Sequence, residues 1–151
     1  MRSKYFTLTA SFLIACGLFL TSFANTLGDG FAMIVNEVNP IATMTASQAK
    51  LIYLRKINKR WKELSKNIIP VDNKSNSECR KSFLANVVAM SSDEMGRFFT
   101  EREYQNAEAP PVKTDSDAST IDYVENNPGA IAFVSKASVK PGHKVKIVLE
   151  F

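Results

Sequence analysis

The sequence has little of the residue types on which enzyme and metal chemistry most often depend. Its 151 residues include two cysteines and one histidine, and no GxGxxG, P-loop, HExxH or CxxC motif occurs. His143 lies in a Pro-Gly turn with no cysteine or acidic cluster beside it, which argues against a zinc site or a Ser/His/Asp triad. The acidic residues are scattered over expected helix starts and loops, where they favour the helix dipole. We therefore predict that the protein is not an enzyme and holds no metal or organic cofactor.

Long hydrophobic runs are also missing after the first two dozen residues, and none approaches the ~20 apolar residues that cross a bilayer. The start of the chain differs, because two basic residues precede an apolar stretch at residues 5–20 and small residues follow it. This pattern is typical of an export signal, and Ser-Phe-Ala at 22–24 has the form that a signal peptidase cleaves. We predict a signal peptide at residues 1–24, cleaved after Ala24, and a periplasmic domain at residues 25–151.

Two alternatives to soluble export stay open for this segment. The run Leu-Ile-Ala-Cys ending at Cys16 fits the form in which a cysteine is acylated after cleavage, which would make the protein a lipoprotein. The other alternative is an uncleaved membrane anchor. Cleavage after Ala24 leaves 17 basic residues (19 − 2) and 15 acidic ones, a formal charge of +2, so no nucleic-acid partner is expected.

The order of apolar and polar segments predicts an α/β domain. Runs of β character occupy residues 31–35, 67–72, 130–134 and 144–151. The first and third runs have no polar alternation, which is typical of strands buried on both faces, whereas the last alternates as a half-exposed strand does. Pro70 indicates that its strand either lies at an edge or starts late.

Capping signals mark where the expected helices begin. The signals are Thr45 with Gln48, Ser77, Ser91 with Glu94, and Ser116. Asn-Pro-Gly at 127–129 ends the last helix, because proline cannot continue it and glycine accepts the left-handed backbone of a helix C-terminus. Cys79 falls on the apolar stripe of its helix, so we interpret it as a buried apolar residue. Residues 106–117, with paired prolines, are predicted to be a loop.

Strands separated by helices predict a three-layer sandwich with a mixed, mainly parallel sheet. One segment stands out by charge: residues 55–67 contain six lysines or arginines, one glutamate and the chain's single tryptophan, Trp61. Such a run either binds phosphates or lipid head groups or is a solvated helix end and loop with Trp61 folded onto the core. The second interpretation is the more common one.

Several expected helix starts are rich in serine, threonine and asparagine. Free N–H groups and the helix dipole make such a start a natural anion site, and in open α/β sheets these starts gather beyond the carboxyl ends of strands. The alternative is plain capping, which we favour at Thr45 and Ser116. At residues 75–77 the two interpretations are equally balanced.

The segments taken together resemble the short phosphate ABC transporter substrate-binding proteins. The matching pieces are Ile-Val-Asn at 34–36, "MTASQAKLIYLRK", Trp61 followed by "IIPVD", "SECRKSFL", "MSSDEMGRFF", the Pro-Pro loop and "NNPGAIAFV". They extend over residues 31–134. The resemblance implies one lobe of a type II periplasmic-binding-protein fold, and a ligand site for phosphate or a related oxyanion. The residues implied are Asn73, Ser75, Asn76, Ser77, Arg80 and Thr45.

The sequence departs from the family pattern at this site. Asp72 and Asn73 stand where the family's arginine is expected, and Glu78 and Cys79 replace a glycine and a threonine. A glutamate at this helix start would repel a phosphate dianion. Arg80 either compensates for the missing arginine or pairs with Glu78 or Asp72.

Two hypotheses follow. The first is a solute-binding protein for phosphate or a related oxyanion in ABC transport. The second is an accessory or sensory module that has lost its ligand and docks on a membrane partner. A homodimer that supplies the second lobe would reconcile them.

Overall fold

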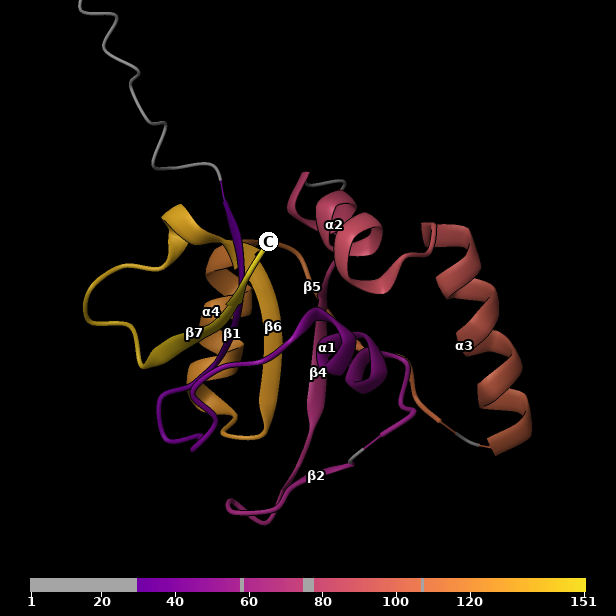
Figure 1. Ribbon diagram of the computed structural model, residues 1–151, viewed down its shortest axis with the longest axis horizontal. Coiled ribbons are helices and arrows are strands. Elements are labelled where there is room, and N and C mark those ends of the chain that lie inside the picture. The colour runs from indigo at the N-terminus through magenta and orange to yellow at the C-terminus, as the bar shows by residue number, and fades with distance from the viewer. Residues whose placement is uncertain (1–29, 58, 75–77, 107) are drawn as a thin grey trace, which may run out of the picture.

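The computed structural model describes residues 30–57, 59–74, 78–106 and 108–151 (Figure 1). The predicted signal peptide, its cleavage site at Ala24 and Cys16 lie outside these residues. No helix in the described ranges is long and apolar enough to cross a membrane. The elements, in chain order, are β1 (Phe31–Asn36), α1 (Ala46–Tyr53), β2 (Arg60–Trp61), β3 (Lys66–Asn67), β4 (Ile69–Asn73), α2 (Glu78–Phe83), the π-helical turn η1 (Leu84–Val88), α3 (Ser92–Asn106), β5 (Val112–Thr114), α4 (Asp117–Asn126), β6 (Ala130–Ser135), the 3₁₀ turn η2 (Lys136–Ser138) and β7 (Val145–Glu150).

The main sheet has five strands in the order β5-β4-β6-β1-β7, and β2 and β3 form a separate hairpin. Strand β4 is parallel to β5 and to β6, while β1 is antiparallel to β6 and to β7. It follows that β4, β5, β6 and β7 run in one direction and β1 runs against them. The predicted mixed, mainly parallel sheet is confirmed.

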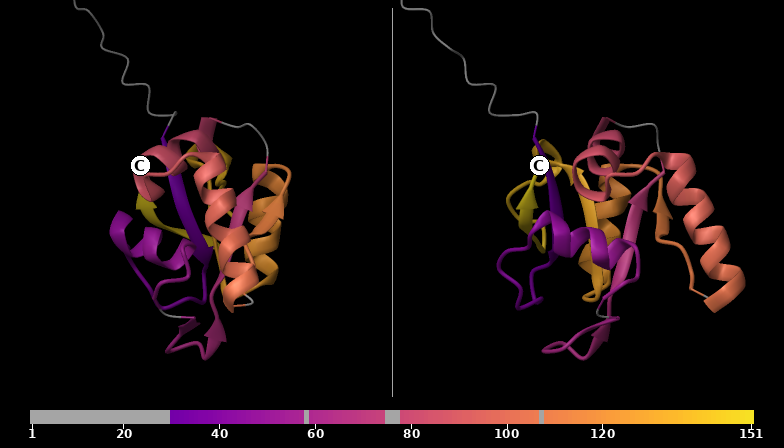
Figure 2. Two further views of the ribbon diagram at one scale, coloured as in Figure 1. Left: turned by 90° about the vertical axis from the view of Figure 1, so that its right-hand side faces the viewer. Right: turned by 45° about the vertical axis from the view of Figure 1, so that its right-hand side comes forward.

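Helices cover both faces of this sheet and make three layers (Figures 1 and 2). Along β6, Ile131 and Phe133 belong to the apolar cluster under α1, α2 and η1, and Ala132 and Val134 belong to the cluster under α4. Every residue of β6 from Ala130 to Val134 is at most 1% exposed. The unalternated apolar run is therefore buried between two layers, as its pattern predicts.

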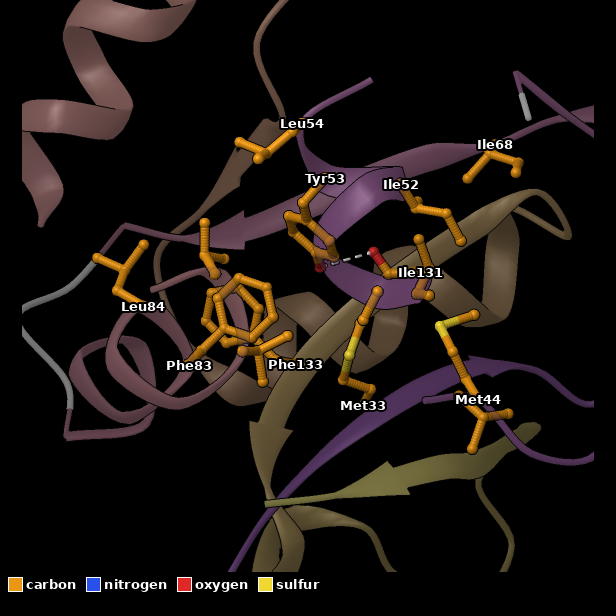
Figure 3. Close-up of a cluster of buried hydrophobic side chains, with 14 of the residues drawn as sticks. Met33, Met44, Ile52, Tyr53, Leu54, Ile68, Phe83, Leu84, Ile131 and Phe133 are labelled. Atoms are coloured by element: carbon orange, nitrogen blue, oxygen red, sulfur yellow. Dashed lines mark hydrogen bonds between the residues drawn. The ribbon is translucent and has the colours of Figure 1, made fainter. Parts of the chain in front are cut away.

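The larger cluster has an aromatic centre (Figure 3). Phe83 of α2 stacks on Phe133 of β6 with ring centroids 4.1 Å apart, and the Tyr53 ring lies 4.6 Å from that of Phe83. The Tyr53 hydroxyl donates to the backbone oxygens of Val71 (2.8 Å) and Ile131 (3.2 Å). Burial, with a smaller contribution from Asp72, raises the pKa of Tyr53 well above its ordinary value. The hydroxyl thus joins α1 to two neighbouring strands.

The capping signals set the helix starts as predicted. Thr45 and Gln48 form a reciprocal capping box at α1, and Ser91 and Glu94 exchange the same pair of bonds before α3. Ser116 caps α4. The predicted cap at Ser77 lies outside the described residues. Trp61 is 8% exposed and packs on the core, which confirms the more common interpretation of the basic segment for this side chain.

Of the two positions predicted from Pro70, the edge is wrong, since β4 lies between β5 and β6. The late start is closer, because β4 begins at Ile69 and its pairing with β5 begins only at Val71. The register explains how a proline is accommodated. Strand β5 pairs with β4 only from Val71 onward, whereas β6 pairs with Ile69 and Pro70. At position 70 no β5 residue stands opposite to receive an N–H, so the missing donor leaves no gap in the ladder.

The loop predicted at residues 106–117 contains the short strand β5. Its strand begins directly after Pro111, and it pairs on one side only, with β4. The paired prolines excluded a central strand but not this edge strand.

The alternation predicted for residues 144–151 is also wrong in part. Met33 of β1 pairs with Leu149 and Ile34 pairs with Ile147, so Val148 is the extra residue of a β-bulge. The bulge shifts the face of the strand. Strict alternation would place Val148 on the polar face, with Lys146 and Glu150, whereas Val148 is 4% exposed in the core.

Gly129 is needed for a reason other than the predicted left-handed cap. Among the described glycines only Gly142 has a positive φ. A Cβ on Gly129 would lie 2.1 Å from the backbone oxygen of Asn67 in β3. The backbone of Gly129 also accepts hydrogen bonds from Ile69 N (2.9 Å) and Trp61 Nε1 (3.0 Å), which keep the β2–β3 hairpin against the start of β6.

Replacing Gly129 by alanine should therefore destabilise the fold. We expect a loss of about 2 kcal/mol or more, because the backbone of β3 must move to admit the methyl group. Urea unfolding of the two proteins measures the difference. The matched control is Gly96→Ala in α3, where nothing lies within 4 Å of the added Cβ and the change should stabilise the helix by about 0.5–1 kcal/mol. Equal effects at the two positions would contradict the close approach of β3 to Gly129.

Candidate functional site

The carboxyl ends of β4 and β5 meet the start of α2 and the start of α4 (Figure 1). Five polar side chains gather at this place, and we call them the carboxyl-edge cluster: Asp72, Asn73, Arg80, Lys113 and Asp117. Outside the carboxyl ends of the strands is where open α/β sheets bind ligands. The residues of the cluster are thus in the position expected for a site.

Asp72 is the centre of the cluster. It lies near the end of β4, and its side chain is 3% exposed. Arg80 of α2 donates two hydrogen bonds to its carboxylate, from Nε to Oδ1 at 2.9 Å and from an Nη to Oδ2 at 3.1 Å. Lys113, directly opposite in the β5 register, also donates to Oδ2. A buried carboxylate is favourable only when it is paired in this way.

Asn73 and Asp117 make a separate set of bonds, which reaches β6. Asn73 Nδ2 donates to Asp117 Oδ1 at 3.1 Å. The other oxygen of Asp117 accepts from the backbone N–H of Ser135 (3.0 Å) and from the hydroxyl of Ser138 (2.7 Å). Asp117 in the first turn of α4 thereby ties the ends of β4 and β6 to that helix, and its charge suits the helix dipole.

The start of α2 presents its charge to solvent. The carboxylate of Glu78 is 78% exposed and pairs with Lys81 at 2.7 Å, so the partner of Arg80 is Asp72 and not Glu78. Cys79 is buried, and burial, together with the charge of Asp117, raises the pKa of its thiol to about 12. The thiol stays protonated at neutral pH, as its place on the apolar stripe predicts.

The structure brings only some of the predicted ligand residues together. Asn73 and Arg80 lie in the carboxyl-edge cluster, and Ser75, Asn76 and Ser77 lie outside the described residues. Thr45 is elsewhere: its neighbour Met44 donates to Val148 of β7, at the opposite edge of the sheet from β5. The hydroxyl of Thr45 accepts from the N–H of Gln48, the plain capping role favoured for it.

Sequence reasoning missed Lys113 and Asp117. Lys113 lies in the segment predicted to be a loop. Its partner Asp72 is 41 residues away in the chain, so only the β4–β5 register reveals the pair. Asp117 looked like an ordinary first-turn acid. In the described part of the chain no three histidine, cysteine or acidic side chains group as a metal site.

The fold matches one lobe of solved phosphate receptors. No family model and no curated protein matches the chain significantly. A structure from Clostridium perfringens, described as a candidate phosphate ABC transporter substrate-binding protein with bound phosphate, matches with 27% identity and a TM-score of 0.62 over 80% of this chain and 44% of the other. An ABC-type phosphate transport receptor from Vibrio cholerae matches with 24% identity and a TM-score of 0.60 over 80% and 45%. PstS from Borrelia burgdorferi matches at 16% identity and a TM-score of 0.58, over 80% and 46%.

The chain thus has the fold of one lobe of a periplasmic phosphate-binding protein, and it spans less than half the length of the structures it matches. Those structures are described as receptors and binding proteins. The likeness at the lower identities concerns the fold.

Neutralising Asp72 should destabilise the domain. In Asp72→Asn, Arg80 and Lys113 lose their common counter-charge, and since both are partly exposed and can rehydrate, we expect a loss of about 2 kcal/mol in the free energy of unfolding. Urea unfolding at neutral pH provides the measurement. Asp115→Asn is the control, because Asp115 is 86% exposed at 4.0 Å from Lys74, and its midpoint should barely change.

Proposed function

We propose that the protein is an exported, solute-binding-protein-like domain that binds phosphate or a related oxyanion at the carboxyl-edge cluster. The observation that carries the proposal is the convergence of Arg80 and Lys113 on one point at the carboxyl ends of β4 and β5. The same lobe fold, with 27% identity, occurs in a structure with bound phosphate. Two cations from different elements at a ligand-binding edge are suited to an oxyanion.

Lys113 is the cation best placed to reach a ligand. Its side chain is 48% exposed and extends from an edge strand, so it can turn from Asp72 toward an anion while β5 stays in place. Arg80 is held more firmly, with its side chain 17% exposed and a third bond to Ser92 Oγ at 3.0 Å. In this proposal Arg80 supplies a positive charge in a fixed position, and Lys113 contacts the ligand. Asn73 and residues 75–77 supply further donors.

The setting of the proposal is phosphate ABC transport. An export signal at residues 1–24 places the domain in the periplasm, where a membrane permease is the partner. The solved receptors are about twice as long as this chain, which matches one lobe of them. In this proposal a homodimer in which two carboxyl edges face each other supplies the facing lobe.

A second candidate is the accessory or sensory module that has lost its ligand. The observation that favours it is the pairing inside the cluster, where Arg80 and Lys113 both bond to Asp72. A second acid, Asp117, bonds to Asn73 and brings the formal charge of the cluster to zero. An incoming anion meets a site with no formal excess of positive charge. In this case the domain acts by docking on a membrane partner.

Thermal unfolding with phosphate separates the two candidates. At a hundred times its dissociation constant a ligand stabilises by about 2.7 kcal/mol, which moves the midpoint of a domain of this size by several degrees. A receptor should show this shift with millimolar phosphate and not with sulfate at matched ionic strength. No shift with either anion would leave the docking module as the function.

Lys113→Gln tests the assignment of the ligand contact. We expect the affinity for phosphate to fall about tenfold, because one charge-assisted hydrogen bond is lost. Lys81→Gln is the control, since Lys81 is an exposed lysine on α2 that pairs with Glu78 outside the cluster. Equal losses in the two variants would indicate a general charge effect and not a contact at Lys113.

A further inference from the structure

A pocket lies at the opposite end of the sheet from the carboxyl-edge cluster. It has a volume of about 330 Å³ and is lined by residues 39–41, which follow β1, and by residues 60–63 of the β2–β3 hairpin. The hairpin and the segment after β1 lie at the same end of the molecule, away from α2 (Figures 1 and 2). We call this the hairpin pocket.

Asn39, one of the residues that line the pocket, has a buried hydrogen-bond donor without a partner among the described residues. Asn39 is 0% exposed, and its Nδ2 is a buried side-chain nitrogen that no acceptor among the described residues reaches. Nearly all buried polar groups in proteins are hydrogen-bonded, so an unpaired amide beside a cavity points to an occupant.

The orientation of this amide is fixed by the turn in which it lies. Asn39 Oδ1 accepts from the backbone N–H of Ile41 at 3.1 Å, and Asn39 N donates to Asn36 O at 3.0 Å. Flipping the amide would set its NH₂ group against the N–H of Ile41, donor against donor. Nδ2 therefore remains the free donor, and an occupant must supply an acceptor.

The other walls of the pocket specify the charge of that acceptor. Arg60 and Lys62 are exposed cations, and Glu63 is the one acid in the lining, which leaves one formal positive charge in excess. Trp61 Nε1 is bonded to Gly129 O, so the indole is a wall and not a donor. A singly charged carboxylate, which only accepts hydrogen bonds, suits one amide donor flanked by cations better than a phosphate dianion does.

On the other side of the hairpin, basic residues already bind a carboxylate of the chain itself. There Glu108 accepts from Lys59 at 3.0 Å and from Arg102 at 2.8 Å, and these bonds lower the pKa of its carboxyl. One flank of the basic segment thus has a carboxylate of its own, whereas on the Asn39 flank the donor is unpaired.

From these observations we propose that the hairpin pocket binds a carboxylate group, with Asn39 Nδ2 as the buried donor and Arg60 and Lys62 as the flanking charges. The group comes either from a small free acid or from an aspartate or glutamate of a peptide segment. This site is separate from the carboxyl-edge cluster and does not depend on phosphate binding there.

Trp61 makes the proposal directly measurable, because it lines the pocket and is the only tryptophan of the chain. We would titrate the full chain with succinate, and separately with a capped Asp/Glu-rich peptide, at constant ionic strength set with chloride. Trp61 emission and the melting midpoint are the two readouts. A saturable change with succinate identifies a small acid, and a change with the peptide alone identifies a protein segment; both support the site.

The variants separate a site from general attraction. Asn39→Asp keeps the acceptor to Ile41 and removes the donor, so binding should be lost. Lys62→Glu should weaken binding about fivefold, whereas Lys56→Glu, an equal charge change at an exposed lysine outside the pocket, should not. The Lys62 and Lys56 pair decides the question even if Asn39→Asp fails to fold.

Three results would overturn the proposal: no change in either readout with either carboxylate, equal weakening by the Lys62 and Lys56 variants, or a Trp61 response to phosphate equal to that with succinate. Because Trp61 lies at the far end of the sheet from Arg80, absence of phosphate binding at the carboxyl edge leaves the outcome of this titration unchanged.

Discussion

The double burial of β6 is the constraint on which the rest of the structure depends. Its side chains alternate between two apolar clusters, so one helix layer is required on each face. A strand covered in this way must also have its backbone paired on both edges, which β4 and β1 do. Once β6 is fixed, β4 ends beside the start of α2, and the polar residues of both elements meet. The carboxyl-edge cluster is a consequence of how the core strand is enclosed.

Signals within a few residues of one another were sufficient for the elements that they describe. The capping boxes at Thr45 and Ser91 set two helix starts, and the apolar run at β6 set a buried strand, because these depend on local hydrogen bonds and periodicity. The position of Pro70, the bulge at Val148 and the need for Gly129 depend on which strand lies alongside. Such neighbours are far away in the chain, so the sequence pattern contains no trace of them.

The site residues likewise fall into those that the sequence indicates and those that only the strand register reveals. The resemblance to the phosphate-binding family, together with the helix start, implied Arg80 and Asn73, and Asp72 was one of the two partners considered for Arg80. Lys113 was missed because it acts across the β4–β5 register. The consequence is physical: with one cation Asp72 would form a simple pair, whereas with two it is the shared counter-charge of Arg80 and Lys113. Asn73 and Asp117 make a separate set of bonds that reaches β6.

The hydrogen-bond donors at the two ends of the sheet differ in whether they already have an acceptor. At the carboxyl edge, two cations that suit an oxyanion already have a buried carboxylate between them, so an external anion competes with Asp72 for Lys113. At the hairpin end, a buried donor of a pocket-lining residue has no acceptor within the part of the chain that the structure describes. Since an unpaired buried donor is costly and a paired one is not, the free energy to be gained from a first hydrogen bond is larger at Asn39 than at Lys113. The fold indicates the edge at which open α/β sheets bind ligands, but the state of the donors indicates where this chain has most to gain by binding.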